Sequence, residues 1–458
     1  MSCEGDACPK DLLFGAEFAV SGSRTLAEDL MPALIEGYAD TLDAGLEREV
    51  GVSGGSRGFS IIHSSGEEMA AIDVASIDPA SAFAGLADGS AAIAMSSRPL
   101  DEDAADLLRG AGLPDPRTAG GESIVALDGL LTVVHPDNPI RSISVGEIAQ
   151  VFSGQITNWS DLGGRNAPIN LYGREAGSGT MDTLDSLILA PNGLETAPGI
   201  QRIASNRDLS DAVSADPAGI ALVPFAYRRA GKALPIRQEC GILSHPTRFN
   251  IKTEEYPLSR RLYLYNTERN APAHARRLLD FARSGEAVPY VRDAGFVSLS
   301  PDAQGVSDQG LRISYALTRQ DEFSLPLMRE MLTDLDGAER LSTTFRFTPG
   351  SSQLTAKSQS DAEALARQIV SGAYEGRDVL LVGFTDSIGQ FALNRALAER
   401  RAQGVLFTMA AAAEQAGGGA DFDGANIEIR GYGEMTPVGC NTTFAGRVAN
   451  RRVEVWVR

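Results

Sequence analysis

Short apolar stretches alternate with helical patterns over the first 300 residues, and this repetition restricts the chain to few folds. Residues 14–21 are typical of a strand, and Leu26, Leu30 and Leu34 then recur at helical spacing. Further strands are predicted at residues 91–95, 127–135, 169–172, 220–225 and 261–265. Strands that alternate with helices in this way predict an α/β domain with mainly parallel sheets.

The distribution of charge divides the chain near residue 340. Of the 458 residues, 60 are acidic and 41 basic, which gives a net charge of −19. Residues 341–458 hold 12 of each, so the whole negative excess lies in the first 340 residues. Such a change indicates two modules. The polar, weakly patterned residues 301–340 are expected to be a linker with some structure of its own, and residues 341–458 a second, smaller α/β domain.

Composition excludes several classes of function. The net charge of −19 disfavours nucleic acid as a partner, because nucleic-acid binding needs a basic surface. No apolar run approaches the ~20 residues of a membrane-spanning helix. Residues 1–10 lack the regions of a secretory signal, which indicates either a cytosolic protein or a processed chain. Neither a metal site nor a nucleotide or other cofactor is predicted, because the corresponding motifs are missing.

Four cysteines allow three complete disulfide pairings. Cys3 and Cys8 lie close together around Gly5, and a disulfide between them is expected. That bond would require export to an oxidising compartment. Cys240 and Cys440 are isolated in the sequence and are expected to be buried thiols.

Small hydroxylic residues and glycines gather where predicted strands lead into helices. They lie at Ser23–Thr25, Ser97 and Ser178–Thr180, and a further serine cluster ends at Ser56. The start of a helix offers backbone N–H groups and a partial positive charge, so it can hold an anion without a basic protein surface. Arg174 adds a guanidinium that can bind an oxyanion through two hydrogen bonds. The alternative at each junction is an ordinary helix cap or turn.

The order of several motifs resembles a known family. These motifs are Gly22–Thr25, Ser96–Leu100, Leu127–Val134, Val151–Gly164, Gly173–Thr180 and Tyr256–Tyr263. Residues 11–300 thereby resemble the phosphate-binding (PstS-like) substrate-binding proteins of bacterial ABC importers. The resemblance implies a two-lobed periplasmic-binding-protein fold (type II-like), with the first lobe at about 11–120 and 226–300 and the second at about 121–225.

The resemblance also implies that a tetrahedral oxyanion such as phosphate is held between the lobes. The residues it assigns to phosphate or a related oxyanion are Ser23, Arg24, Thr25, Ser56, Ser97, Arg174, Ser178, Gly179 and Thr180. Members of the family often have an aspartate at the position of Ser97, and its carboxylate accepts the proton of hydrogen phosphate. The serine leaves the identity of the oxyanion open.

An arginine interrupts an apolar stripe in the helix predicted after Phe391. The stripe repeats every four residues, at Leu393, Leu397, Arg401, Val405 and Met409. A partly buried arginine needs an anion, and Asp386 lies in the loop before the helix. From the residues alone, three interpretations stay open: a snorkelling arginine, an internal Asp386–Arg401 pair, and joint binding of a zwitterionic ligand.

Residues 341–458 resemble the OmpA-like peptidoglycan-binding domain. The motifs that carry this resemblance are Val382–Gly389, Leu397–Ala402, Gly431–Glu434 and Asn450–Val455. It implies that Asp386 and Arg401 recognise the diaminopimelate of the peptidoglycan stem peptide, with Asn394 and Arg451 in support.

The two resemblances together predict a solute-binding protein of the periplasm or cell envelope of a Gram-negative bacterium, and not an enzyme. It would be anchored non-covalently to peptidoglycan and pass its oxyanion to an ABC permease. The alternative is a wall-anchored sensor or structural protein whose PstS-like domain is not used in transport. A serine hydrolase is disfavoured, because the four histidines lie in no triad motif.

Overall fold

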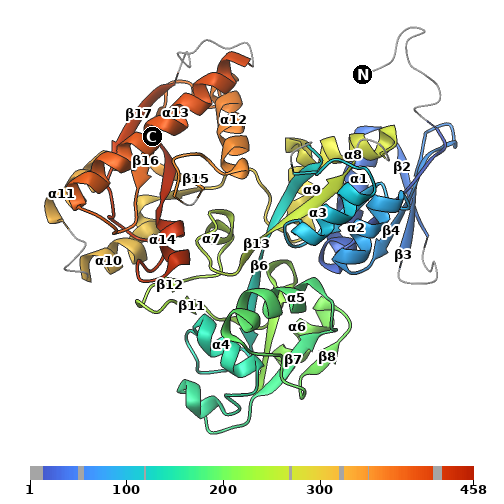
Figure 1. The fold of residues 1–458 in the computed structure, drawn as a ribbon, viewed down its shortest axis with the longest axis horizontal. Helices are drawn as coiled ribbons and strands as arrows, with labels where there is room; N and C mark the ends of the chain where they lie inside the picture. Colours follow the sequence, from blue (N-terminus) through green and yellow to red (C-terminus); the bar gives the residue numbers. More distant parts are fainter. Residues whose placement is uncertain are drawn as a thin grey trace. The chain divides into compact units, whose positions relative to one another are not determined.

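The chain forms two compact units (Figure 1). The computed structural model describes residues 14–49, 56–117, 120–267, 271–318, 324–348, 350–415 and 425–458. The expected Cys3–Cys8 disulfide lies outside these residues. The first unit comprises Met1–Pro235 and Leu258–Ser300, and the second comprises Ile236–Pro257 and Pro301–Arg458. Residues 236–257, called the insert below, therefore leave the first unit and return to it.

The first unit is built on an eleven-stranded sheet with the order β2-β3-β4-β1-β5-β13-β6-β9-β7-β8, and β10 pairs with β6. β1 is parallel to β4 and β5, whereas β13 is antiparallel to β5 and β6. The sheet is therefore mixed rather than mainly parallel, because the chain returns from the insert along β13. The strands are β1 (Ala16–Gly22), β2 (Gly45–Glu49), β3 (Ser56–Ile62), β4 (Glu68–Ser76), β5 (Ile93–Ser96), β6 (Glu122–Val134), β7 (Asn170–Arg174), β8 (Gln201–Ile203), β9 (Gly219–Pro224), β10 (Lys232–Ala233) and β13 (Ser259–Asn266).

The long strand β6 connects two lobes of this unit. Residues 122–129 of β6 pair with β13, and residues 130–134 pair with β9. The first lobe thus contains β1–β5 and β13, and the second contains β7–β9. The helices are η2 (Leu26–Leu30), α1 (Met31–Thr41), α2 (Pro79–Asp88), α3 (Glu102–Gly110), α4 (Val145–Phe152), η3 (Trp159–Leu162), α5 (Gly179–Leu184), η4 (Asp185–Leu189), η5 (Ala190–Asn192), α6 (Asn206–Ala215), η6 (Phe225–Tyr227), α8 (Ala273–Arg283), η7 (Gly285–Ala287) and α9 (Val288–Asp293).

The second unit has a five-stranded sheet with the order β14-β15-β18-β16-β17 and helices on both faces. Leu365 of α12 and Val405 of α13 pack on one face, and Met328 of α11 packs on the other. The elements are β11 (Ile236–Arg237), β12 (Leu243–Ser244), α7 (Arg248–Lys252), β14 (Ala303–Gly305), η8 (Val306–Gln309), α10 (Gly310–Thr318), α11 (Leu325–Asp334), β15 (Glu339–Arg346), α12 (Ala356–Val370), β16 (Asp378–Phe384), α13 (Phe391–Gln415), β17 (Asn426–Gly431), α14 (Phe444–Asn450) and β18 (Arg452–Val457).

Residues 301–340 are part of the second unit and do not form a linker between two domains. They form β14, η8, α10, α11 and the start of β15, all within the second unit. β14 is an edge strand antiparallel to β15, and α10 and α11 bury Ala316, Met328 and Met331 against the sheet. Short helices that bury few side chains show only weak hydrophobic periodicity in the sequence, and the segment was therefore predicted to be a linker.

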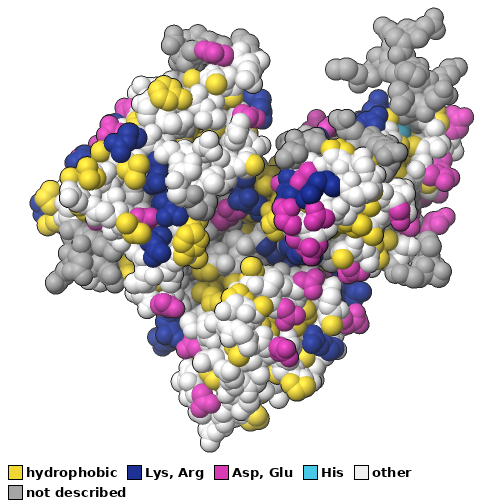
Figure 2. Space-filling view, viewed as in Figure 1, with side chains coloured by type: hydrophobic (Ala, Val, Ile, Leu, Met, Phe, Trp, Pro, Cys, Tyr) yellow, Lys and Arg dark blue, Asp and Glu magenta, His cyan; other side chains and the backbone are white. Residues whose placement is uncertain are grey.

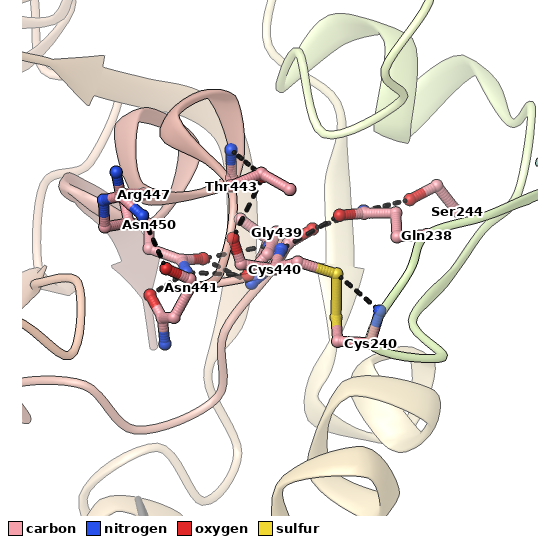
Figure 3. The surroundings of a disulfide bond; sticks show 11 residues. Gln238, Cys240, Ser244, Gly439, Cys440, Asn441, Thr443, Arg447 and Asn450 are labelled. Carbon is pink, nitrogen blue, oxygen red and sulfur yellow. Dashed lines mark hydrogen bonds between the residues drawn. A yellow bond between two sulfur atoms is a disulfide. The ribbon is translucent and has the colours of Figure 1, made fainter. Parts of the chain in front are cut away.

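Cys240 of the insert and Cys440 form a disulfide (Figure 3). The prediction that both are buried thiols is therefore wrong. The two residues are 200 positions apart in the sequence. They meet because the insert, although it interrupts the first unit in sequence, packs within the second.

Acidic side chains are spread over the surface of the first unit in the view of Figure 2, in line with the acidic excess before residue 340. Among the described residues, no helix is both long and apolar enough to cross a membrane. In the same part of the chain, no group of three or more His, Cys, Asp or Glu side chains is placed to hold a metal ion.

Candidate functional site

Three segments predicted to bind an anion meet at one point in the first unit. Ser23 follows β1, Ser97 follows β5, and Gly179 begins α5. A Cβ atom on Gly179 would lie 2.3 Å from the Ser97 Oγ and 3.2 Å from the Ser23 Oγ. The serines belong to the first lobe and the glycine to the second, so the lobes approach closely here. A residue without a side chain is required for this approach.

Hydrogen-bond donors surround this point. Thr25 and Thr180 are buried, and the buried Ser23 hydroxyl has no hydrogen-bond partner among the described residues. Backbone N–H groups in the first turn of a helix have no acceptor within that helix. Ser178 caps α5 by accepting a hydrogen bond from the Met181 N–H. We call Ser23, Thr25, Ser97, Ser178, Gly179 and Thr180 the hydroxyl cluster; its donors suit an oxyanion.

Arg260 adds a buried guanidinium beside the hydroxyl cluster, and the sequence analysis did not assign it a role. It lies on β13, where its Nη1 donates to the Gly179 carbonyl over 3.0 Å and its Nη2 lies 3.5 Å from the Thr25 Oγ1. The Nη2 also donates to the carboxylate of Asp128 on β6 over 2.7 Å. Arg260 therefore braces loops of both lobes. The sequence placed Arg260 in an apolar strand, and this could have indicated a structural role, because a buried arginine needs acceptors.

The guanidinium of Arg174, a predicted anion ligand, binds protein acceptors in this structure. Arg174 is 1% exposed, and its Nε and Nη2 donate to the carbonyls of Ile203 and Ala204 over 3.1 and 2.6 Å. Glu28 lies 3.7 Å from its Nη2. Burial lowers the pKa of Arg174, and the charge of Glu28 acts in the opposite direction.

Polar contacts join the two lobes around the hydroxyl cluster. Arg24, another predicted ligand, donates to the Glu175 carboxylate over 3.2 Å and to the Ser76 hydroxyl over 3.3 Å. Two further contacts between the lobes are Asn206–Glu28 at 3.1 Å and Arg207–Asp29 at 2.7 Å. Arg24 thus links the two lobes, because its Nε bonds to the first lobe and its Nη1 to the second.

Ser56 lies apart from the hydroxyl cluster. It begins β3 opposite Ala75 on β4, and β4 separates β3 from β1. Residues 50–55, which include the rest of its serine cluster, are outside the described residues. The role of Ser56 as an oxyanion ligand stays a prediction.

A second polar site lies where β16 ends in the second unit. The Asp386 Oδ2 accepts a hydrogen bond from the Arg451 Nη1 over 2.7 Å, and its Oδ1 accepts one from the Ile388 N–H over 3.0 Å. The Asn394 Nδ2 donates to the Asp386 carbonyl over 3.3 Å and to the Glu434 carboxylate over 2.9 Å. Asp386, Asn394 and Arg451 therefore lie together, as the sequence analysis expected of a shared site.

Arg401 belongs to the same site, and part of its guanidinium makes no hydrogen bond to the described residues. Arg401 is 8% exposed, and its guanidinium lies 5.3 Å from the centre of the Phe347 ring. Its Nε and Nη1 have no hydrogen-bond partner among the described residues. Asp386 is paired with Arg451, and the structure records no hydrogen bond between Asp386 and Arg401. Burial lowers the pKa of Arg401, as does the charge of Arg451. A buried guanidinium without an acceptor can receive a carboxylate.

The chain matches two known families. Residues 71–286 match the PBP superfamily domain, and residues 346–451 match the OmpA family. The phosphate-binding protein PstS of Bacillus subtilis is 30% identical over 177 residues, 38% of this chain and 57% of PstS. The outer-membrane lipoprotein YfiB of Pseudomonas aeruginosa is 46% identical over 79 residues, 17% of this chain and 42% of YfiB. The matches thus span little more than half of PstS and less than half of YfiB.

Among solved structures, an ABC-type phosphate transport receptor from Vibrio cholerae aligns with 61% of this chain and 99% of its own length. The two are 23% identical, and the TM-score is 0.46.

Proposed function

We propose that this chain, which joins a domain of the PBP superfamily to a domain of the OmpA family, is a solute-binding protein of the cell envelope. The first unit captures phosphate or a related oxyanion at the hydroxyl cluster, and the second unit holds the chain to peptidoglycan. PstS is named a phosphate-binding protein, which supports the first part, and YfiB is named an outer-membrane lipoprotein, which supports the envelope location. An ABC permease is the partner that this proposal implies.

The unpartnered Ser23 hydroxyl carries the oxyanion part of the proposal. It is buried where the lobes come closest, beside Gly179 and Ser97. A buried hydroxyl without a partner costs about 1–3 kcal/mol, and a bound oxyanion would remove that cost. The negative charge of the first 340 residues does not oppose this, because the donors act on an enclosed ligand at hydrogen-bond distance.

Ser23→Ala is expected to weaken phosphate binding by about 10- to 100-fold, because a hydrogen bond to a charged group contributes about 1.5–3 kcal/mol. The unliganded protein should be as stable as wild type or more so, since the change removes an unsatisfied buried hydroxyl. Isothermal titration calorimetry with inorganic phosphate measures the first effect, and thermal unfolding without phosphate measures the second.

Ser21→Ala is the matched control for this prediction. The Ser21 hydroxyl is also buried without a partner, but it faces Gly85 of α2, where a Cβ would lie 3.7 Å from it. Phosphate affinity should therefore be unchanged. Equal losses in Ser21→Ala and Ser23→Ala, or no heat from phosphate, sulfate or related oxyanions with the wild-type chain, would count against the oxyanion site.

The wall-binding part of the proposal rests on Asp386 and Arg401. Diaminopimelate carries an amine and a carboxylate on the same carbon, and the two side chains offer groups of opposite charge. Two buried nitrogen atoms of Arg401 have no hydrogen-bond acceptor among the described residues, so both can donate to the carboxylate of the ligand. The Cys240–Cys440 disulfide supports an envelope location, since disulfides persist in oxidising compartments such as the periplasm.

Arg401→Leu is expected to reduce binding to peptidoglycan at least tenfold while the fold is retained. Leucine replaces the guanidinium beside the Phe347 ring by apolar volume, and no acceptor of Arg401 among the described residues is left unpaired. A lost charge-assisted hydrogen bond accounts for a change of this size, about 1.5–3 kcal/mol. Co-sedimentation with purified sacculi that contain diaminopimelate measures the binding. Arg400→Leu, at the exposed neighbouring position, is the control; equal co-sedimentation of both variants with wild type would refute the anchor.

A further inference from the structure

We propose that the second unit has an additional site, formed by the insert and α10, that binds the glycan part of a peptidoglycan fragment. This inference rests on the proposed wall-binding function, because it extends the stem-peptide site at Asp386. No residue of the site belongs to the first unit.

A cavity of about 440 Å³ lies between the insert, the η8–α10 segment and the loop after β17. Its volume is in the range of small-molecule sites. The side chains that define its chemistry are Asn250, Gln304, Gln309, Ser314, Tyr315 and His245. Amide and hydroxyl groups both donate and accept hydrogen bonds, as sugar hydroxyls and acetamido groups require of a partner. An aromatic ring such as that of Tyr315 can cover the apolar face of a sugar ring.

A smaller cavity lies next to this site. It has a volume of about 120 Å³ and shares Tyr315 and Pro437 with the larger cavity. Ser387, the residue directly after Asp386, also lines the smaller cavity. In peptidoglycan the stem peptide is covalently attached to a sugar. A fragment whose peptide is held at Asp386 can therefore place its sugar toward the larger cavity.

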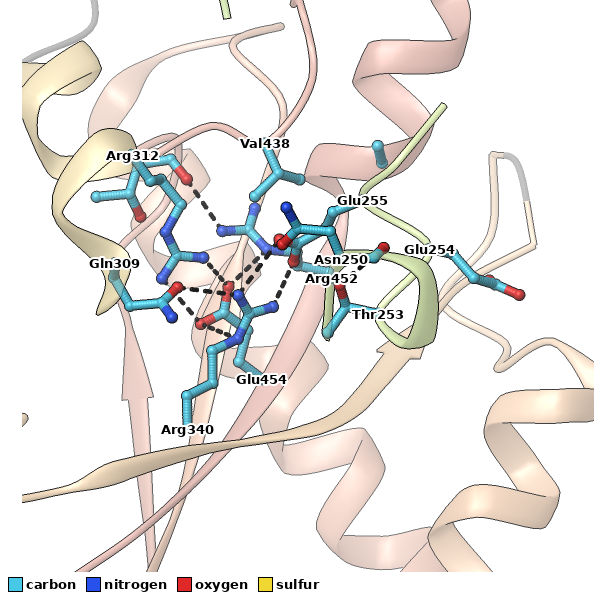
Figure 4. A network of polar contacts seen from close by, with 12 residues as sticks. Asn250, Thr253, Glu254, Glu255, Gln309, Arg312, Arg340, Val438, Arg452 and Glu454 are labelled. Carbon is cyan, nitrogen blue, oxygen red and sulfur yellow. Dashed lines mark hydrogen bonds and ion pairs between the residues drawn. The ribbon is translucent and has the colours of Figure 1, made fainter. Parts of the chain in front are cut away.

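The walls of the larger cavity are held in place before any ligand binds. Figure 3 shows Gln238 of the insert beside Cys440: its Oε1 accepts a hydrogen bond from the Cys440 N–H over 3.0 Å. The disulfide fixes the same two segments. Glu255 and Arg312 also line the cavity and belong to a network of buried ion pairs (Figure 4). Prearranged walls reduce the entropy lost on binding.

The lining favours a glycan over a longer peptide. Most of the polar lining side chains are neutral amides and hydroxyls, Glu255 and Arg312 are already paired with protein charges, and the carboxylate of Asp308 accepts a hydrogen bond from the Gly305 N–H. The free carboxylates and amines of a second peptide would find few unpaired charges there. Leu243 and Leu311, 43% and 63% exposed, add apolar surface beside the polar groups, a combination that matches the two kinds of surface on a sugar ring.

The test compares two probes on the full chain: a diaminopimelate-containing tripeptide, and the same tripeptide attached to its N-acetylated disaccharide. We expect the disaccharide probe to bind wild type about tenfold or more tightly than the tripeptide, a gain of the size that one or two additional hydrogen bonds supply. Tyr315→Ala should abolish the gain and leave tripeptide affinity unchanged. Ser314→Trp, which fills the cavity from an exposed position, should do the same if Tyr315→Ala fails to fold.

Leu317→Ala, an exposed change on α10 outside the cavity lining, is the control and should keep the gain. Equal affinity of wild type for the two probes would overturn the glycan site alone. So would persistence of the gain in both cavity variants, or the same gain with a sugar-free pentapeptide. Absence of binding to either probe would instead overturn the proposed wall-binding function.

Discussion

Replacing Glu255 by glutamine is expected to lower the free energy of unfolding of the second unit by about 3–5 kcal/mol, the cost of removing one partner from a buried ion pair. Glu255 comes from the insert and pairs with Arg340, which is 1% exposed. Glutamine has nearly the same shape but no charge. The variant thus tests the charge of Glu255 rather than its volume.

The effect is expected to be large because positive charge already exceeds negative charge in this network. Arg312, Arg340 and Arg452 share two carboxylates, those of Glu255 and Glu454. Burial lowers the pKa of Arg452 to about 10, which shows how unfavourable its charge is there. Burial is the largest influence and alone would raise the pKa of Glu255, but the charge and hydrogen bond of Arg340, together with the charges of Arg312 and Arg452, hold that pKa below its ordinary value.

The lowered pKa values of the two carboxyl groups also make the stability of the second unit depend on pH. Glu255 and Glu454 have pKa values below the ordinary value in the folded chain. Their stabilising contribution is therefore complete above the unfolded glutamate pKa of about 4.3 and is lost as the pH falls toward their folded pKa values. The difference in stability between wild type and Glu255→Gln should be constant from pH 7 to about pH 5 and shrink in stronger acid.

The two tryptophans allow the second unit to be observed alone. Trp159 lies in the first unit and Trp456 in the second. In a Trp159→Phe background, tryptophan fluorescence during urea unfolding reports only on the surroundings of Trp456, whose Nε1 donates to Glu454 over 3.1 Å. Glu239→Gln, an exposed change in the insert, is the matched control. A Glu255→Gln midpoint equal to that control would show that Arg340 does not depend on Glu255.

The sequence was sufficient for features set by local pattern. Strand–helix alternation predicted the α/β class, and the start of α5 at Gly179 follows from its capping serine, Ser178. The hydroxyl cluster was predictable because each of its members sits at a junction of a strand and a helix. The Asp386 loop and Arg401 were predictable because an apolar stripe and the motifs that resemble the OmpA-like domain lie in one continuous segment.

Features that depend on distant residues could not be predicted in the same way. Nothing in residues 236–257 indicates that they pack with residues beyond 300, so the disulfide partner of Cys240 was hidden. Arg260 gains its role only because β13 lies between β5 and β6. Arg452 and Glu454 alternate with valines on β18, a pattern typical of a strand with one solvent-exposed face, yet helices cover both faces of this sheet.

Replacing Cys240 and Cys440 together by serine is expected to lower the free energy of unfolding of the second unit by up to about 5 kcal/mol. The disulfide joins residues 200 positions apart, and closing so long a loop removes much of the conformational entropy of the unfolded chain. Urea unfolding followed through Trp456 measures the loss. Reduction of the wild-type chain with dithiothreitol should reproduce it without any substitution.

The same double substitution should also weaken binding to sacculi, because Cys440 adjoins a residue that contacts the stem-peptide site. The Asn441 Oδ1 accepts hydrogen bonds from the Ser387 N–H over 3.3 Å and from the Asn450 Nδ2 over 2.8 Å. Cys3→Ser with Cys8→Ser removes the same number of cysteines near the start of the sequence and should change neither the stability of the second unit nor its binding to sacculi. If reduction leaves the Trp456 transition unmoved, the disulfide does not restrain the unfolded chain, and the insert is held by its non-covalent contacts alone.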